Sequence, residues 1–169
     1  MSKTIYLIRH CQKDDNSGKD LSKEGIVYAK LLAEHFEKEI SPVPQVILSQ
    51  APADLLDKEI RHTSNRPYET ALTIAHKLKS SVVTRKSWSH EAIEEIVKAI
   101  HETKEEVILV VWEHHMLPEI AAKLINSKDT FYWNYNPEKK AAKHQDIYDL
   151  LFIIKHGQLT ANKLPKPVG

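Results

Sequence analysis

Five short apolar runs, separated by segments with helical periodicity, constrain the fold of this chain more than any other feature. The runs lie at residues 4–8, 45–49, 81–84, 106–112 and 147–154. Most of them are continuous rather than alternating, which is typical of strands that are buried on both faces of a sheet. We therefore expect a sheet that is covered by helices on each side.

The segments between the runs supply those helices. Apolar residues recur at spacings of three and four over residues 22–38, 67–78 and 91–101, and a shorter helix is expected to follow Pro118 and end near Ile125. Ser89 is the expected N-cap of the third helix, which would place Glu91 in its first turn. The alternation of strand and helix predicts an α/β fold with a mostly parallel central sheet.

The length and charge of the chain limit its organisation and its partners. The 169 residues suit one domain, which we place at residues 1–158, with a flexible tail over 159–169. Residues 127–145 are polar and are expected to be irregular. The formal net charge of +1 predicts neither a nucleic-acid nor a membrane partner. Without a signal peptide or an apolar run near the roughly 20 residues of a membrane span, we expect a cytoplasmic protein.

Polar side chains follow three of the predicted strands at the point where each strand ends. They are Arg9, His10, Cys11, Gln12 and Lys13 after the first strand, Ser49 and Gln50 after the second, and Glu113, His114 and His115 after the fourth. Arg66 stands just before a predicted helix. Ligands bind parallel sheets at the carboxyl ends of their strands, so these groups are expected to share one pocket. The planar guanidinium groups of the arginines and the start of a helix both favour the binding of phosphate in this pocket.

His10 and Cys11 are adjacent candidates for a nucleophile. A cysteine-dependent phosphatase needs an arginine six residues after its cysteine, and this chain has Ser17 there. Two aspartates in the same loop would repel an anion. We therefore favour His10.

His114 and His115 could suggest a metal ligand pair. Adjacent residues on a strand point to opposite faces, however, and no HExxH or comparable spacing occurs. Cys11 is the only cysteine, and the four glycines form no nucleotide-binding cradle. We therefore expect neither a metal nor a cofactor.

Four segments, in order along the chain, resemble the histidine phosphatase superfamily, which includes cofactor-dependent phosphoglycerate mutases and bacterial phosphohistidine phosphatases. They are LIRHCQK, LSKEGIVYAKLLAEHF, SNRPYETA and VVWEHHMLPEIA, and the resemblance spans residues 3–155. It is nearest to a branch with RHAEK-like and WEH-like patterns. The resemblance implies a phosphoglycerate mutase-like α/β/α sandwich in which His10 becomes phosphorylated. It also implies that Arg9 and Arg66 hold the phosphate and that His114 is the second catalytic histidine.

The chain departs from the family pattern at three points. Cys11 replaces the usual glycine, and Glu113 replaces a small residue before the second histidine. The carboxylate general acid has no clear counterpart; Glu91 lies in the corresponding region, and His90 and Glu113 are weaker candidates. We assign substrate contacts to Lys13, Ser49, Glu113 and His115.

These residues predict a metal-independent phosphatase that acts through a phosphohistidine on a small phosphate ester or a phosphoprotein. A mutase is the less favoured enzyme, because it would need a larger, closed pocket to hold its intermediate. The alternative from another class is a non-catalytic module that binds phosphate or a phosphoprotein, which the three departures motivate.

Overall fold

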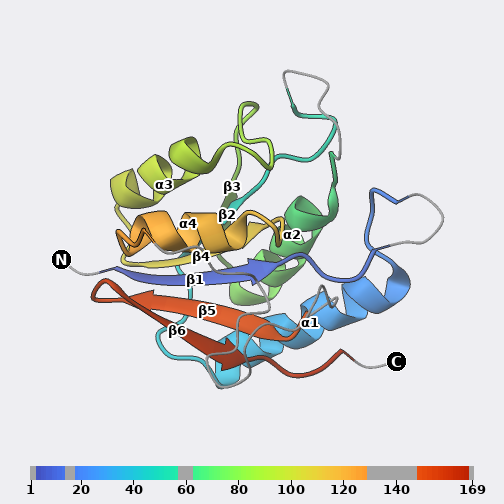
Figure 1. Ribbon diagram of the computed structural model, residues 1–169. Coiled ribbons are helices and arrows are strands. Elements are labelled where there is room, and N and C mark those ends of the chain that lie inside the picture. The colour runs from blue at the N-terminus through green and yellow to red at the C-terminus, as the bar shows by residue number, and fades with distance from the viewer. Residues whose placement is uncertain (1–2, 14–17, 57–62, 129–147, 168–169) are drawn as a thin grey trace.

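The computed structural model describes residues 3–13, 18–56, 63–128 and 148–167. Strands and helices alternate through most of these residues (Figure 1). In chain order the elements are β1 (Thr4–Arg9), α1 (Lys23–Lys38), β2 (Val46–Ser49), α2 (Arg66–Leu78), β3 (Ser81–Val83), α3 (Ile93–Glu102), β4 (Val107–Trp112), α4 (Leu117–Leu124), β5 (Leu150–Lys155) and β6 (Gln158–Lys163).

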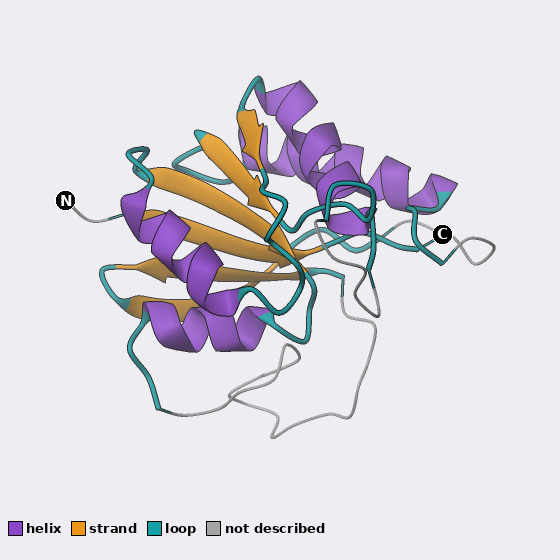
Figure 2. Ribbon diagram, turned by 90° about the horizontal axis from the view of Figure 1, so that it is seen from above, coloured by secondary structure: helices purple, strands orange, loops and turns teal. Residues whose placement is uncertain are grey.

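The strands form one six-stranded sheet in the order β3-β2-β4-β1-β5-β6. The four strands β3, β2, β4 and β1 run parallel, whereas β5 and β6 are antiparallel to their neighbours. Helices lie on both faces of this sheet (Figure 2). The predicted three-layer α/β/α sandwich with a mostly parallel sheet is therefore confirmed.

Two hydrophobic cores, one on each face of the sheet, hold the layers together. Alternate residues of β1 point to opposite cores, with Tyr6 packed in the core under α1 and α2 and Leu7 in the core under α3 and α4. Because successive side chains of a strand alternate, a strand with a core on each side must be apolar throughout. The continuous apolar runs of β1 and β4 follow from this arrangement.

The first strand, the four helices and the second, third and fourth strands lie within about two residues of their predicted bounds. The predicted fifth strand, 147–154, starts too early at residues 148 and 149, which precede β5 at Leu150–Lys155; residue 147 lies outside the described residues. The predicted irregular segment 127–145 lies, from residue 129 on, outside the described residues. No helix among the described residues is long and apolar enough to cross a membrane.

The prediction of a flexible tail over 159–169 is wrong for residues 159–165. Gln158–Lys163 form β6, and Leu164 is buried while its amide donates to the Asp149 carbonyl. The hairpin turn between β5 and β6 consists of His156 and Gly157, both with positive φ, as a two-residue turn of this kind requires. Strand β6 has no apolar run because it is an exposed edge strand, so periodicity did not indicate it.

The predicted N-cap of α3 is also wrong. The helix begins at Ile93, with Ala92 as its N-cap, so Glu91 precedes the helix instead of lying in its first turn. The backbone around Ser89 is already committed to a tight turn, in which the Ala92 amide donates to the Ser89 carbonyl. The next carbonyl, that of His90, accepts the indole N–H of buried Trp112. Because these bonds hold the backbone in a turn, α3 begins later than predicted, at Ile93.

Candidate active site

Strand register brings the two main site segments together. Arg9 and Trp112 are paired as the last residues of the parallel strands β1 and β4. His10 and Glu113 therefore leave the sheet at the same level, at its carboxyl edge. A pocket of about 420 Å³ lies there, and it is lined by Arg9, His10, Lys13, Gln50, Ser64, Arg66, Pro67, His90, Glu113, His114, His115 and Met116. Of the residues expected at this edge, Cys11, Gln12 and Ser49 do not line the pocket, and neither does Glu91, the proposed proton donor.

The loop after β1 is held in place by α1. A Cβ atom at Gly25 would lie 2.3 Å from the Gln12 carbonyl oxygen, so only glycine lets the helix approach this closely. The same carbonyl oxygen accepts a hydrogen bond from the amide of Ser22, whose side chain caps α1. This close packing fixes the direction in which the chain leaves β1.

His10 is held as a neutral imidazole. Its Nδ1 lies 2.7 Å from the carbonyl oxygen of Cys11, which can only accept, so Nδ1 carries the proton and Nε2 carries the lone pair. The side chain is 4% exposed. Burial lowers the pKa of His10 well below its usual value of 6.5, and the positive charges of Arg9 and Arg66 lower it further. The ring is therefore uncharged near neutral pH.

Cys11 is buried in the core under α1 and α2 and does not line the pocket. Burial raises the pKa of its thiol to about 12, so almost no thiolate exists near neutral pH. Its amide donates to the Thr70 hydroxyl, and its φ is not in the left-handed region that the usual glycine can adopt. The substitution of glycine by cysteine therefore requires no backbone strain.

Two arginines reach the pocket from different elements. The guanidinium of Arg9 stacks over the ring of Tyr148, 4.1 Å from its centroid, which holds this buried cation at the end of β1. Arg66 begins α2, and its Nη1 donates to the Gly18 carbonyl. Arg66 Nε is buried and has no hydrogen-bond acceptor among the described residues. A buried donor without an acceptor has much to gain from a bound anion.

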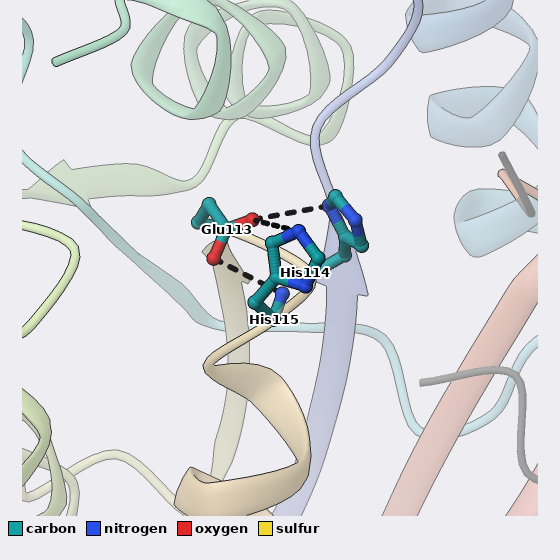
Figure 3. Close-up of side chains that lie close together, drawn as sticks. All are labelled: Glu113, His114 and His115. Atoms are coloured by element: carbon teal, nitrogen blue, oxygen red, sulfur yellow. Dashed lines mark hydrogen bonds and ion pairs between the residues drawn. The ribbon is translucent and has the colours of Figure 1, made fainter. Parts of the chain in front are cut away.

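The turn after β4 carries three ionisable residues in succession (Figure 3). The carboxylate of Glu113 lies 3.2 Å from Nδ1 of His114 and 3.8 Å from Nε2 of His115. The two imidazole rings lie side by side, with centroids 4.0 Å apart. His114 and His115 therefore do not point to opposite faces as predicted, because β4 ends at Trp112 and both residues lie in the turn that follows.

The predicted contact from Ser49 does not form. Its side chain is fully buried, and its hydroxyl donates to the Gln50 carbonyl at 2.8 Å. Gln50 lines the pocket instead, and its side-chain oxygen accepts a hydrogen bond from the Glu113 amide. Gln50 thereby ties the end of β2 to the turn after β4. The inward alternation of side chains at a strand end could have indicated Gln50, because Ser49 is the last residue of the buried strand.

Glu91 does not line the pocket, whereas its neighbour His90 does. The Glu91 side chain is 69% exposed, and its carboxylate lies 3.5 Å from Nε2 of His90, whose side chain is only 13% exposed. His90 is therefore the group between Glu91 and the pocket. The sequence had favoured Glu91 over His90, because Glu91 is a carboxylate in the region where the resemblance places the general acid.

The environment of His10 predicts its titration. Because the pKa is lowered, the ring should stay neutral at pH 6.5, where an unperturbed histidine is half protonated. Nitrogen-15 NMR of the imidazole rings over pH 5.5–8 measures this directly. Half-protonation of His10 at or above pH 6.5 would contradict the burial and charge argument.

No protein-family profile matches this sequence, and no curated protein sequence does. Solved structures do match it. The candidate phosphohistidine phosphatase SixA from Nakamurella multipartitia is 13% identical, with a TM-score of 0.64 over 100% of this chain and 98% of its own. The α-ribazole phosphatase from Shigella flexneri is 14% identical, with a TM-score of 0.61 over 97% and 96%. Phosphoglycerate mutase from Plasmodium falciparum is 15% identical, with a TM-score of 0.58 over 97% and 91%.

These three structures belong to the histidine phosphatase superfamily. At such low identity the likeness shows the fold alone. The resemblance noted from the sequence is thus confirmed at the level of the fold, which is phosphoglycerate mutase-like.

Proposed function

We propose that this protein is a phosphatase that hydrolyses phosphate monoesters or phosphoproteins through a phosphohistidine at His10. One observation carries the proposal. A buried, neutral histidine, tied to a backbone carbonyl through Nδ1, lines a pocket that it shares with Arg9, Arg66 and His114. A neutral imidazole surrounded by cations suits attack on a phosphorus atom, because the cations attract the phosphate while the nucleophile keeps its lone pair.

The reaction would take place in two steps. In the first, Nε2 of His10 attacks phosphorus, the N–P bond forms and the ester P–O bond breaks, and the leaving oxygen takes up a proton. In the second, water attacks the phosphohistidine, the N–P bond breaks, and inorganic phosphate leaves together with a proton. Nδ1 keeps its proton and its bond to Cys11 throughout, which orients the ring for both steps.

The positive groups would stabilise the transferring phosphoryl group. Arg9 and Arg66 supply planar, charge-assisted donors for its equatorial oxygens, and a protonated His114 supplies a third. These groups would do the work that Mg²⁺ does in a kinase, so the proposed reaction needs no metal ion. The Glu113 carboxylate lies 3.2 Å from Nδ1 of His114, on the far side of the ring from Nε2.

A proton must also reach the leaving group when it is an alkoxide. We assign this task to His90 in preference to Glu91, because His90 lines the pocket, whereas the Glu91 carboxylate lies outside it, 3.5 Å from Nε2 of His90. In this arrangement the carboxylate acts only through the ring.

The exposure of Glu91 leads to a specific expectation. Glu91→Gln should reduce the turnover of an alkyl phosphate by less than about tenfold, well below the 10²–10⁴-fold that general acids contribute. It should leave nitrophenyl phosphate unaffected, because a nitrophenolate needs little protonation. Initial rates with both substrates measure this. A loss of 10²-fold or more, confined to the alkyl substrate, would identify Glu91 as the acid itself.

A substrate screen tests the proposed function. Wild-type protein should release inorganic phosphate from at least one class among sugar phosphates, phosphoamino acids, phosphohistidine peptides and nitrophenyl phosphate. The variant His10→Gln, which keeps a polar side chain but removes the imidazole, should release none above the background, while His101→Gln, which alters an exposed histidine of α3, should match the wild type. Phosphate binding without release from any class would favour the non-catalytic binding module instead.

A specific feature of the pocket motivates that second function. The carboxylate of Glu113 lies in a pocket whose other ionisable side chains are all basic. A negative charge there would weaken the hold on a transferring phosphoryl group unless His114 compensates for it. A binding module could tolerate this, and it would form no phosphohistidine.

A further inference from the structure

We propose that Glu113, His114 and His115 form a binding site for a divalent transition-metal ion of the zinc class, on the wall of the same pocket. The site goes beyond the proposed phosphatase reaction, which does not require it. It is the group of metal-ligating side chains that the described residues bring together.

The ligand atoms already have nearly the spacing that a tetrahedral ion needs. One oxygen or nitrogen atom from each residue can be chosen so that all three lie within 4.8 Å of one another. The Glu113 oxygen is 3.2 Å from His114 Nδ1 and 3.8 Å from His115 Nε2 (Figure 3). Ligands about 2.0–2.1 Å from a tetrahedral zinc ion are roughly 3.3–3.4 Å apart. Shifts of about 1 Å or less in side chains of a surface turn would complete the site.

The backbone of Glu113 is held on every side. Its amide donates to the side chain of Gln50, and its carbonyl accepts from the amides of Met116 and Leu117 at the start of α4. Its second carboxylate oxygen accepts from the His115 amide at 3.0 Å, which leaves the first oxygen directed at the two rings. Such outer contacts orient metal ligands in advance and strengthen binding.

The ligand set determines which ions fit. Two imidazoles and one carboxylate suit zinc, copper, nickel and cobalt, whereas magnesium and calcium prefer a shell of oxygen atoms. We therefore expect the site to bind Zn²⁺ or Co²⁺ and to ignore millimolar Mg²⁺.

Three protein ligands leave the fourth position of a tetrahedral ion open. All three residues line the pocket, so the open position lies where a phosphate oxygen can reach it. An ion bound to Nδ1 of His114 takes the place of the proton there, so the positive charge beside the phosphate then comes from the ion. Metal and phosphate should therefore each raise the affinity for the other, by about fivefold or more. This coupling, unlike the metal site itself, rests on the proposed assignment of the pocket to phosphate.

Cobalt is a suitable probe, because its visible absorption is strong when it is tetrahedral and weak when it is octahedral. The full-length chain, stripped of metal with a chelator, should bind one Co²⁺ with the strong spectrum. Glu113→Gln and His115→Ala should each weaken Co²⁺ binding by at least about tenfold, the loss that outer-shell changes alone can cause. His101→Ala, which removes an exposed histidine of α3, should leave the titration unchanged.

Three results would overturn the site: no Co²⁺ binding by the wild type, equal binding by all the variants, or loss on His101→Ala alone. Neither variant should disturb the fold, because His115 is exposed and glutamine matches the shape of glutamate. Both variants should therefore unfold at the wild-type temperature. A second titration in inorganic phosphate tests the coupling, and weaker Co²⁺ binding there would contradict the open position. Because the spectrum requires no turnover, an inactive protein that still binds Co²⁺ would refute only the proposed phosphatase activity.

Discussion

Replacing His10 with alanine should abolish turnover, with a loss on the order of 10⁴-fold or more, as expected when a covalent nucleophile is removed. Cys11→Ala should retain most of the activity. The two residues are neighbours, but only His10 lines the pocket, and its lowered pKa keeps it neutral. The Cys11 thiol lies in the core, and its pKa of about 12 leaves it protonated. Initial rates with nitrophenyl phosphate measure both effects.

The folded state of each variant serves as the control for this comparison. His10→Ala leaves Arg9, Arg66 and His114 in place, so the inactive variant should still bind inorganic phosphate and gain thermal stability from it. Loss of phosphate binding together with activity would indicate damage to the pocket and not loss of a nucleophile. A Cys11→Ala protein that is folded and inactive would overturn the assignment to His10.

Replacing Arg66 with alanine should weaken the binding of inorganic phosphate by roughly ten- to a hundredfold. Losing a hydrogen bond to a charged group costs about 1.5–3 kcal/mol, which corresponds to that change in affinity. The physical reason lies in the buried Nε of Arg66, which lacks an acceptor among the described residues and would gain one from the phosphate. Isothermal titration calorimetry measures the dissociation constant.

Arg85 provides a matched control for Arg66. It is exposed, its guanidinium lies 5.5 Å from the centroid of the Trp88 ring, and it does not line the pocket. Arg85→Ala removes the same charge from the chain, so any general effect of charge would appear in both variants. Equal phosphate affinity in Arg66→Ala and wild type would place the anion site elsewhere.

The buried parts of the fold were predictable, because burial on two faces leaves a strong trace in the sequence. Strands β1 and β4 must be apolar throughout, and α1 and α2 need apolar residues at helical spacing on the side that packs against the sheet. Even in these helices, the spacing of apolar residues predicted where each helix lies more accurately than which of its residues are buried. Ile26 and Leu72 belong to the apolar stripes, yet both are exposed, and Tyr28 and Ile74 are buried instead.

The errors concern features that depend on contacts between distant residues. Strand β6 is held by its pairing with β5, and an exposed edge strand has no need of an apolar run. The late start of α3 depends on a hydrogen bond from Trp112, a residue of β4, to the carbonyl of His90. The sequence around Ser89 gives no indication of that bond, so the N-cap of α3 was predicted at the wrong residue.

The same distinction applies to the site. Arg9, His10 and His114 were placed in one pocket because strand ends converge in a parallel sheet, and a topology rule is enough to predict that. Arg66 was singled out because it stands at the start of a helix. Gln50 was placed at this edge without a role and Tyr148 was missed, since their roles depend on the directions in which single side chains point. The proximity of His114 to His115 was missed because side chains alternate between faces only within a strand. Strand β4 ends at Trp112, before the turn that brings the two rings together.

Identification of the phosphorylated residue is the most direct test of the central claim, that His10 carries the phosphoryl group. The protein is mixed with a labelled phosphodonor, quenched in alkali within milliseconds, digested and mapped by mass spectrometry. We predict label on the peptide that contains His10, stable in base, lost in acid, present in Cys11→Ala and absent in His10→Ala. Acid-stable label, label on Cys11, or steady turnover with no labelled residue would contradict the account.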